Sequence, residues 1–489
     1  MNIDSPKNLT FCLTTNAVGF LPTGLWNPNP GRDGSCKILP LETSFRQGNS
    51  FDFPESTARF SPPPFAVGIQ GQDGRRCLYI VRADTGWHLW NTVEYEWKEH
   101  CLFVTIHLEG DTSPKEAGKH ISIQKTEGNN HEDFFSLLKR GLKKAYPFRK
   151  KQAPPPTWWS LPSFCTGGAS IAMAMAQEGP GPEFCGMRYN NQGLVRKWLK
   201  KLEQFQIPIG TVIIDVGWSC QGVLTVDPIN WPRLKDFIAD QHAIGRHVLL
   251  WLGMWYTDAL PKEWCIQYNG QAVWADPTNP AYRRYLTQQV KELLSPDGYD
   301  ADGFKIDMLQ YVPSEMHARG RRHWHYKETV IPGHQKWKVF NEKKCLGCEM
   351  QHLYQKTIYD AAKSVKPDAL INSSTVHPYF RDCYDMSRLH DTGIVSPDTD
   401  IFELMKIRAE LARATCPDKL IDADNWVYKY YDKWVDYTCR SPQLGTPCIF
   451  FVEDFILDFD REPATRKVDD RDLRKISAAW RKWLSTPEK

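Results

Sequence analysis

The chain has 489 residues, of which 41% are hydrophobic and 24% charged, the composition of a globular protein that can bury large cores. Its 61 basic and 58 acidic side chains leave a net charge of only +3, which excludes a polyanion-binding protein driven by bulk charge. Because it has neither a run of 18 apolar residues nor a visible secretory signal, we expect a cytoplasmic protein without a membrane span.

The first 150 residues are typical of a β domain. Short runs rich in Phe, Val, Ile and Leu predict strands at residues 9–13, 65–69, 77–81 and 101–107. Apolar residues between positions 132 and 145 instead follow the period of one helical face. Residues 150–156, which end in three prolines, form a stiff linker. We therefore predict a β-sandwich domain over residues 1–150 and a second domain over residues 151–489.

The second domain alternates strands with helices. Apolar runs predict eight strands, at residues 158–164, 211–215, 247–252, 303–308, 369–372, 386–389, 419–422 and 448–452. Helical periodicity between them predicts six helices, at residues 193–206, 232–243, 280–294, 349–365, 401–413 and 471–484. Eight strands with intervening helices favour a (β/α)8 TIM barrel. A doubly wound open sheet is the alternative, but no Gly-x-Gly-x-x-Gly loop follows the early strands.

Ionisable and aromatic residues stand at the carboxyl ends of four predicted strands. In a TIM barrel the functional side chains project from these ends. They are Asp215 with Trp218, then Trp251, then Lys305 with Asp307, then Arg388 with Asp391. Burying such groups costs several kcal/mol unless they are paired, so a barrel serving only as a scaffold would not gather them. This pattern predicts an active site.

Lys305 and Asp307 are the most informative pair. Strand alternation places both side chains toward the inside of the barrel, with Ile306 pointing outward. One interpretation is a buried structural ion pair. The other is a carboxylate kept ionised by its lysine neighbour, hence a nucleophile. Asp391 is either a solvated loop acid or a carboxyl group that protonates a leaving oxygen.

Several motifs resemble those of the clan formed by glycoside hydrolase families 27, 31 and 36. Residues 302–307, Asp-Gly-Phe-Lys-Ile-Asp, resemble the nucleophile strand of these families. Residues 215–218, Asp-Val-Gly-Trp, are similar to the Asp-Asp-Gly-Trp motif of the α-galactosidases. Residues 377–381 and 390–392 fall where family 36 carries an arginine loop and its acid/base. The resemblance covers residues 157–455 and implies a divergent member closest to family 36, the α-galactosidase or melibiase type.

The chain also departs from the family pattern. Val216 stands where the α-galactosidases have the second acid of their motif, which helps to hold galactose hydroxyls. The third strand closes as Trp251-Leu-Gly-Met-Trp255 instead of Trp-x-Glu-Pro-Glu-Met. The fifth closes as Asn372-Ser-Ser-Thr-Val376 instead of Cys-Ser-Gly-Gly-Gly. Galactose specificity therefore does not follow from the resemblance.

The resemblance implies a retaining α-glycosidase that acts on a carbohydrate or glycoside and needs no metal or other cofactor. Asp307 would be the nucleophile and Asp391 the acid/base, with their carboxyl groups about 5–6 Å apart. The sugar would be lined by Asp215, Trp218, Trp251, Lys305 and Arg388. Two alternatives stay open: a transglycosylase resembling the raffinose synthases, and a non-catalytic carbohydrate-binding barrel.

A cysteine- and histidine-rich segment suggests a second kind of site. Cys345-Leu-Gly-Cys348 is half of a structural zinc pattern, and it has as neighbours in sequence His317, His323, His325, His334 and His352. The alternative is a basic loop that folds over the barrel mouth. The basic residues 319–326 are either a contact for an anionic substrate or a solvated face.

Overall fold

The computed structural model describes residues 8–14, 17–23, 39–40, 45–48, 65–98, 101–129, 132–147, 154–179, 183–268, 270–309, 312–313, 317–320, 329–332, 337–338, 346–389, 391, 397–424, 426–459 and 464–486. Within these ranges every helix is too short or too polar to cross a membrane. The eleven cysteines whose side chains the structure describes form no disulfide bond.

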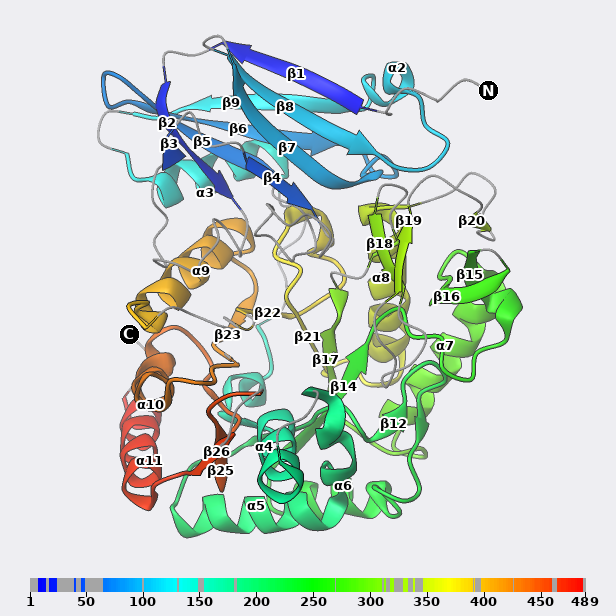
Figure 1. Ribbon diagram of the computed structural model, residues 1–489, viewed down its shortest axis with the longest axis vertical. Coiled ribbons are helices and arrows are strands. Elements are labelled where there is room, and N and C mark those ends of the chain that lie inside the picture. The colour runs from blue at the N-terminus through cyan, green and yellow to red at the C-terminus, as the bar shows by residue number, and fades with distance from the viewer. Residues whose placement is uncertain are drawn as a thin grey trace.

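The amino-terminal region consists of two antiparallel sheets that pack face to face (Figure 1). One sheet has the strand order β1 (Asn8–Thr14), β8 (Cys101–Leu108), β7 (Trp90–Lys98) and β4 (Phe45–Gly48). The other has the order β3 (Leu39–Pro40), β2 (Ala17–Thr23), β5 (Ala66–Gly71), β6 (Arg76–Ala83) and β9 (Ile121–Glu127). Alternate residues of the two sheets form one shared core, which includes Val67, Val81, Val104 and Ile106. The predicted β-sandwich is confirmed.

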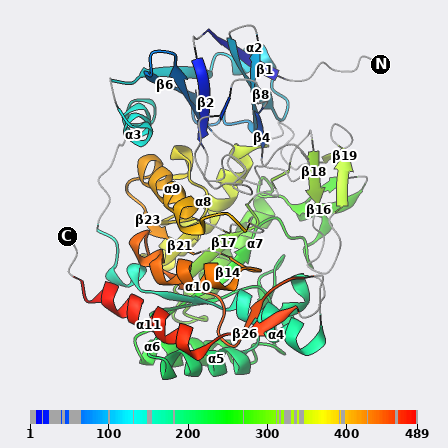
Figure 2. The same ribbon diagram turned by 60° about the vertical axis from the view of Figure 1, so that its left-hand side comes forward.

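One helix joins the sandwich to the barrel. Helix α3 (Phe134–Ala145) follows the short helix α2 (Pro114–Ala117) and the strand β9, and begins at an Asp133 cap. Its apolar face packs on Leu78 and Ile80 of β6, and it also contacts α9 (Ile401–Thr415) of the barrel. Figure 2 shows α3 between the sandwich and α9. The division of the chain at residue 150 into two domains stays a prediction.

Eight parallel strands form the barrel. Their order is β10 (Ser163–Cys165), β11 (Thr211–Ile214), β14 (His247–Gly253), β17 (Gly303–Asp307), β21 (Leu370–Ser373), β22 (Met386–Arg388) and β23 (Leu420–Asp422), with β24 (Cys448–Ile449) beside β10. A parallel bridge between Asp422 and Thr446 links β23 to the segment before β24 and closes the ring. All eight predicted strands are present, so the TIM barrel is confirmed. The first is shorter than predicted, because residues Thr157–Ser160 form a 3-10 turn before it.

The helices outside the barrel are α4 (Thr166–Glu178), α5 (Gln192–Gln204), α6 (Leu234–Ala243), α7 (Pro280–Leu294), α8 (Cys348–Val365), α9, α10 (Tyr431–Arg440) and α11 (Asp470–Leu484). Six of them match the predicted helices. Side-chain caps at Asn191, Asn279, Asp400 and Asp469 begin four of these. The sequence did not predict α4, since residues Thr166 to Met175 are buried on every side and show no amphipathic period. The short α10 was also missed.

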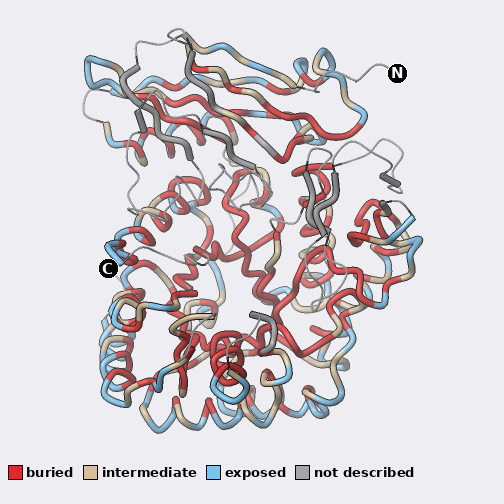
Figure 3. The backbone as a smooth tube through the Cα atoms, viewed as in Figure 1, coloured by how far each residue is buried: buried red, intermediate tan, exposed pale blue. Residues whose placement is uncertain are grey.

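Small antiparallel sheets occur in the connections between barrel elements. They are β12 (Ser219–Cys220) with β13 (Thr225–Val226), β16 (Gln271–Ala275) with β15 (Cys265–Tyr268) and β20 (Trp337–Lys338), β18 (His317–Gly320) with β19 (Thr329–Pro332), and β25 (Asp454–Ile456) with β26 (Thr465–Lys467). Burial is concentrated in the barrel strands, while the outer helices expose one face (Figure 3). The buried side chains at the carboxyl ends of these strands include ionised groups, which define the candidate site.

Candidate active site

A pocket of about 100 Å³ lies at the carboxyl ends of the barrel strands. It is smaller than the roughly 300–1,000 Å³ of sites for drug-sized ligands. Its described lining consists of Gly167, Ile171, Met187, Asp215, Val216, Trp251, Lys305, Asp307, Met308, Arg388, Asp391, Trp426 and Phe450. Six of the seven predicted site residues are in this lining, contributed by segments that are up to 176 residues apart in sequence, from Asp215 to Asp391.

The exception is Trp218, which does not line the pocket. Its side chain is fully buried, and its Nε1 donates a hydrogen bond to the backbone oxygen of Trp251 at 2.7 Å. The chain turns away from the pocket at Gly217, whose φ of +106° and close approach to Met187 exclude a side chain. Trp218 therefore supports Trp251 from behind, and the expectation that it lines the sugar subsite is corrected.

Asp307 closes β17 and is surrounded by donors. Trp251 Nε1 donates to its Oδ2 at 3.1 Å, and the backbone N–H of Met308 donates to its Oδ1 at 2.8 Å. Arg388 Nη1 lies 3.4 Å from the same Oδ1. Hydrogen bonds and a nearby cation favour the ionised form of a carboxyl group. The arrangement presents Asp307 to the pocket as a carboxylate.

Arg388 links three carboxylates with one buried guanidinium. Besides Asp307, its Nη2 contacts Asp391 Oδ1 at 2.8 Å and its Nε contacts Asp424 Oδ2 at 2.6 Å. Burial alone would lower the pKa of Arg388, but these carboxylates raise it well above its usual value. The side chain of Asp391 keeps 31% exposure, and Arg408 donates to its backbone oxygen at 3.1 Å. Asp307 and Asp391 thus contact the two different terminal nitrogens of one buried guanidinium group.

Lys305 faces the inside of the barrel as predicted, but its described partners differ from the expectation. Its Nζ contacts Asp215 Oδ2 at 3.2 Å and Asp424 Oδ2 at 3.6 Å. The thiol of Cys165 lies 3.3 Å from the same nitrogen and donates to Asp215 at 3.0 Å. Burial and Arg388 lower the pKa of Lys305, but the thiol and carboxylates around it raise it well above its usual value. The expectation that Lys305 is the cation beside Asp307 is therefore corrected, since Arg388 occupies that place.

One wall of the pocket is apolar. Val216, Trp251 and Tyr256 pack together, with Met187 and Met308 against them. Val216 is 8% exposed, so it is part of this wall and does not point into solvent. At the position where the α-galactosidases carry an acid, this pocket offers a hydrocarbon surface.

Two acids near the pocket were missed by the sequence analysis. Asp422 and Asp424 stand at the end of β23, and both are almost completely buried. Burial and the charge of Asp424 raise the pKa of Asp422 to about 7. The signal was present as Asp422-Ala-Asp424 at the carboxyl end of the seventh predicted strand, residues 419–422. The rule that functional side chains project from the carboxyl ends of barrel strands, applied to this strand too, predicts both acids as site residues.

The predicted zinc pattern is only partly covered by the described residues. Cys345, His323, His325 and His334 lie outside them, as do residues 321–326 of the basic segment, and Cys348 is buried at the start of α8. In the described ranges one other group has metal-type side chains, formed by His352, Asp382 and Cys383. His352 Nε2 pairs with Asp382 Oδ1 at 2.8 Å, and the Cys383 thiol donates to the backbone oxygen of Phe380. None of these residues lines the pocket described above.

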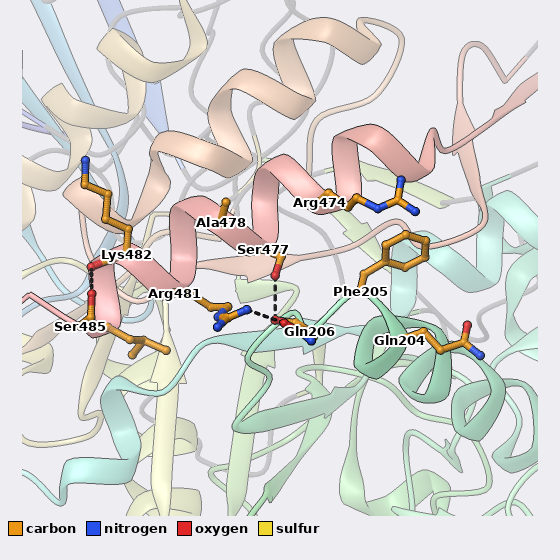
Figure 4. A pocket seen from close by; sticks show the side chains of 10 residues that line it. Gln204, Phe205, Gln206, Arg474, Ser477, Ala478, Arg481, Lys482 and Ser485 are labelled. Atoms are coloured by element: carbon orange, nitrogen blue, oxygen red, sulfur yellow. Dashed lines mark hydrogen bonds between the residues drawn. The ribbon is translucent and has the colours of Figure 1, made fainter.

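A second hollow lies on the outer surface, between α11 and the end of α5 (Figure 4). Gln206 is held there by Ser477, which donates to its backbone oxygen at 2.8 Å, and by Arg481, which donates to its side chain. Its described lining includes Arg474, Arg481 and Lys482 but no carboxylate. Hydrolysis of a glycosidic bond, the reaction that the sequence motifs suggest, generally uses a pair of carboxylates. The barrel pocket is therefore the candidate active site.

Comparisons with known proteins agree with this barrel. Residues 175–377 match the family model described as Glycosyl hydrolases family 31 TIM-barrel domain. A relative described as "Uncharacterized family 31 glucosidase ORF2", from Pseudescherichia vulneris, is 23% identical over 163 residues, which are 28% of this chain and 30% of that protein.

Three solved structures are similar over 98% of the chain. A Kfla1895 mutant in complex with cyclobis-(1->6)-alpha-nigerosyl has a TM-score of 0.61 and 15% identity over 65% of its length. The cycloalternan-degrading enzyme from Trueperella pyogenes in complex with covalent intermediate has a TM-score of 0.60 and 14% identity over 65% of its length. The cycloalternan-forming enzyme from Listeria monocytogenes in complex with pentasaccharide substrate has a TM-score of 0.58 and 13% identity over 43% of its length. At these identities the similarity shows the fold alone, and the chain covers about two thirds or less of each longer protein.

Residues 175–377 of the chain are therefore similar to the TIM-barrel domain of glycoside hydrolase family 31. Family 31 belongs to the clan that the sequence motifs resemble, so this match agrees with the predicted clan. The expectation that family 36 is nearest is wrong, because both the family model and the curated relative are of family 31. An α-galactosidase-like character is accordingly not supported.

Proposed function

We propose that this protein is a retaining α-glycosidase whose nucleophile is Asp307 and whose acid/base is Asp391. The observation that carries the proposal is the pair of pocket carboxylates contacted by one buried guanidinium, with Arg388 Nη1 at 3.4 Å from Asp307 and Nη2 at 2.8 Å from Asp391. A shared cation keeps both carboxyl groups within reach of one sugar ring. The similarity to the family 31 TIM-barrel domain supports the same reaction class.

In this mechanism Asp307 attacks the anomeric carbon while Asp391 gives its proton to the leaving oxygen. The glycosyl group is then bound to Asp307 as an ester. Asp391, now ionised, takes a proton from water, and the resulting hydroxide displaces Asp307. Retention needs the two carboxyl groups about 5–5.5 Å apart, and we expect 5–6 Å in the sugar complex. The covalent intermediate named for the Trueperella pyogenes enzyme is of the kind this route forms.

The remaining pocket residues have defined roles in the proposal. Asp215, Lys305 and Arg388 offer charged partners to the sugar hydroxyls, and Trp251 gives an aromatic surface beside the nucleophile. The apolar wall around Val216 disfavours substrates that need a charged partner there. Together with the glucosidase named as a relative, this favours α-glucosides over α-galactosides as substrates. The mechanism uses side chains alone and requires no cofactor.

A transglycosylase is the second candidate. Its chemistry differs only in the final step, where a sugar hydroxyl takes the place of water. The similarity to a cycloalternan-forming enzyme favours it, since that name describes synthesis of a saccharide. A non-catalytic carbohydrate-binding barrel is disfavoured because Arg388 holds both carboxylates in the pocket. Product analysis with and without an added acceptor sugar separates transfer from hydrolysis.

The proposal is tested with a panel of aryl α-glycosides, each assayed across a range of pH. We expect turnover of at least one α-glycoside, with the α-glucoside ahead of the α-galactoside. The rate should follow a bell-shaped pH profile that reports an ionised nucleophile and a protonated acid. Sugar binding by calorimetry without turnover of any glycoside would favour the non-catalytic barrel. Absence of both binding and turnover would reject the carbohydrate assignment.

A further inference from the structure

Asp424 is a buried carboxylate that contacts both pocket cations. Its Oδ2 lies 2.6 Å from Arg388 Nε and 3.6 Å from Lys305 Nζ, and the side chain is fully buried. No other carboxylate in the described residues contacts both cations. Its Oδ1 accepts no hydrogen bond from any described residue. A buried carboxylate with one unsatisfied oxygen is costly for folding, so its presence calls for a functional explanation.

The surroundings of Asp424 add little other charge. Asp422, on the same strand end, has a pKa near 7 and receives a hydrogen bond from Asn372 of β21 at 2.5 Å. Tyr437 of α10 and Cys448 of β24 also face this region, and burial raises the pKa of each well above its usual value. Near neutral pH these last two groups are uncharged. Arg388 and Lys305 are therefore the cations that Asp424 compensates.

We propose that Asp424 is a positioning residue for the reaction: it holds the Arg388 guanidinium between Asp307 and Asp391 and offsets part of its charge. This role rests on the proposed glycosidase function. Arg388 contacts both pocket carboxylates, yet the reaction needs Asp307 ionised while Asp391 keeps a proton. Because the Asp424 carboxylate contacts Nε of the same guanidinium, it reduces the electrostatic stabilisation that Arg388 gives to ionised Asp391. Asp424 thus lets one cation serve two carboxylates that must differ in protonation.

Replacing Asp424 by Asn should shift the pH dependence of kcat/KM. Asp424→Asn keeps the shape of the side chain but removes its charge, so Arg388 stabilises ionised Asp391 more strongly. The alkaline limb of kcat/KM should move to lower pH by about 1 unit, the smaller end of what one nearby charge does. The acidic limb should move in the same direction. At pH values above the alkaline limb, kcat/KM of Asp424→Asn should therefore be about tenfold below that of the wild type. A residue that only supports packing would lower activity at every pH and leave both limbs in place.

The experiment compares the pH profiles of the wild type, Asp424→Asn and two further variants, on an aryl α-glycoside that the wild type hydrolyses. Asp422→Asn is the matched control, because it is equally buried and adjacent, and the described contacts of Arg388 do not include it. We expect a smaller shift for it than for Asp424→Asn. Asp424→Glu keeps the charge and should keep the limbs in place, even if its rate is lower. An equal shift in both asparagine variants, or no shift in Asp424→Asn, would overturn the proposal.

Two additional measurements keep the proposal separable from the glycosidase function and from folding defects. If the wild type shows no turnover, the pH dependence of binding of the cationic iminosugar 1-deoxynojirimycin replaces the rate profile. Binding with the predicted shift would then reject the glycosidase function alone, and absence of both binding and turnover would reject both. If Asp424→Asn does not fold by circular dichroism, Asp424→Glu decides, because a shifted limb despite the retained charge contradicts the role.

Discussion

The two ends of the barrel hold buried charges in different ways. At the amino end, Asp302 directly precedes β17. Its carboxylate lies 2.7 Å from His242 Nε2 and 3.2 Å from Lys366 Nζ, and it accepts a hydrogen bond from the backbone N–H of Val248 at 2.8 Å. At the carboxyl end, Lys305 and Arg388 are shared among the four carboxylates of Asp215, Asp307, Asp391 and Asp424. The first cluster surrounds one buried acid with donors, whereas the second has more acids than cations.

This difference separates stability from function. Burial by itself raises the pKa of Asp302, but His242, His247 and Lys366 together bring it far below its usual value, so the folded state favours the ion. The pocket carboxylates share two cations, which leaves negative charge facing the space where a sugar would develop positive charge. Active sites commonly hold such arrangements at a cost in stability. We therefore expect substitutions at the carboxyl end to change rates and those at the amino end to change stability.

The largest effect is expected for Asp307→Asn. Without the nucleophile, kcat should fall by at least about 1,000-fold, because the amide cannot form the glycosyl ester. Removing one of four acids around two cations should leave Tm within about 3 °C of the wild type. Steady-state kinetics and thermal unfolding measure the two quantities, with Asp436→Asn on the exposed face of α10 as a control for both. Near-wild-type activity in Asp307→Asn would reject its role as the nucleophile.

The converse is expected for Asp302→Asn. It leaves His242 and Lys366 without their buried anion, and the free energy of unfolding should fall by about 3 kcal/mol, as when a buried ion pair is broken. In the wild type this contribution is present above about pH 3.9 and is lost as the pH falls toward the depressed pKa of Asp302. Urea unfolding measures the loss, and kcat of the remaining folded enzyme should be unchanged.

Asp300→Asn provides the matched control at the amino end. Asp300 is 35% exposed and pairs with Lys366 at 2.7 Å, and its φ of +59° is one that Asn tolerates. Its loss should cost clearly less than the loss of Asp302. Equal losses in the two variants, or a fall of kcat with Asp302→Asn, would remove the contrast between the two ends of the barrel.

A moderate effect is expected for Val216→Asp in the apolar wall. The new carboxylate can accept a hydrogen bond from a sugar hydroxyl, so kcat/KM for α-galactosides relative to α-glucosides should rise by up to about tenfold. Val216→Asn, which adds a polar group without charge, should give a smaller rise. A wild-type preference for α-galactosides over every other glycoside tested would show that the wall does not set this specificity.

The smallest effect concerns His242 and pH. Its hydrogen bond to Asp302 raises the pKa of His242, so its contribution to stability is complete below about pH 6.5 and is lost as the pH rises through the raised value. The stability difference between the wild type and His242→Gln should therefore be larger at pH 5.5 than at pH 8.5. Urea unfolding at both pH values measures it. A difference that is equal at both, or larger at pH 8.5, would contradict the ion pair.

The barrel could be predicted from the sequence because its strands are short apolar runs, several of which end at ionisable or aromatic residues. It failed where the answer depends on contacts between distant segments. Nothing in Lys305-Ile-Asp307 says that the lysine pairs with Asp424, more than 100 residues later, and leaves the cation near Asp307 to Arg388. Helix α4 was missed because a helix buried on all sides has no polar face to give it a period. Trp218 follows a residue with positive φ, so strand alternation could not give its direction.

The most direct test of the central claim is the stereochemistry of hydrolysis, followed by proton NMR of the first product formed from an aryl α-glycoside that the wild type accepts. If Asp307 forms a covalent intermediate and Asp391 then activates water, two inversions give net retention. The α anomer should therefore appear first, and the β anomer should grow in later through mutarotation. First appearance of the β anomer would mean a single displacement by water, which would contradict the double-displacement mechanism built on Asp307 and Asp391.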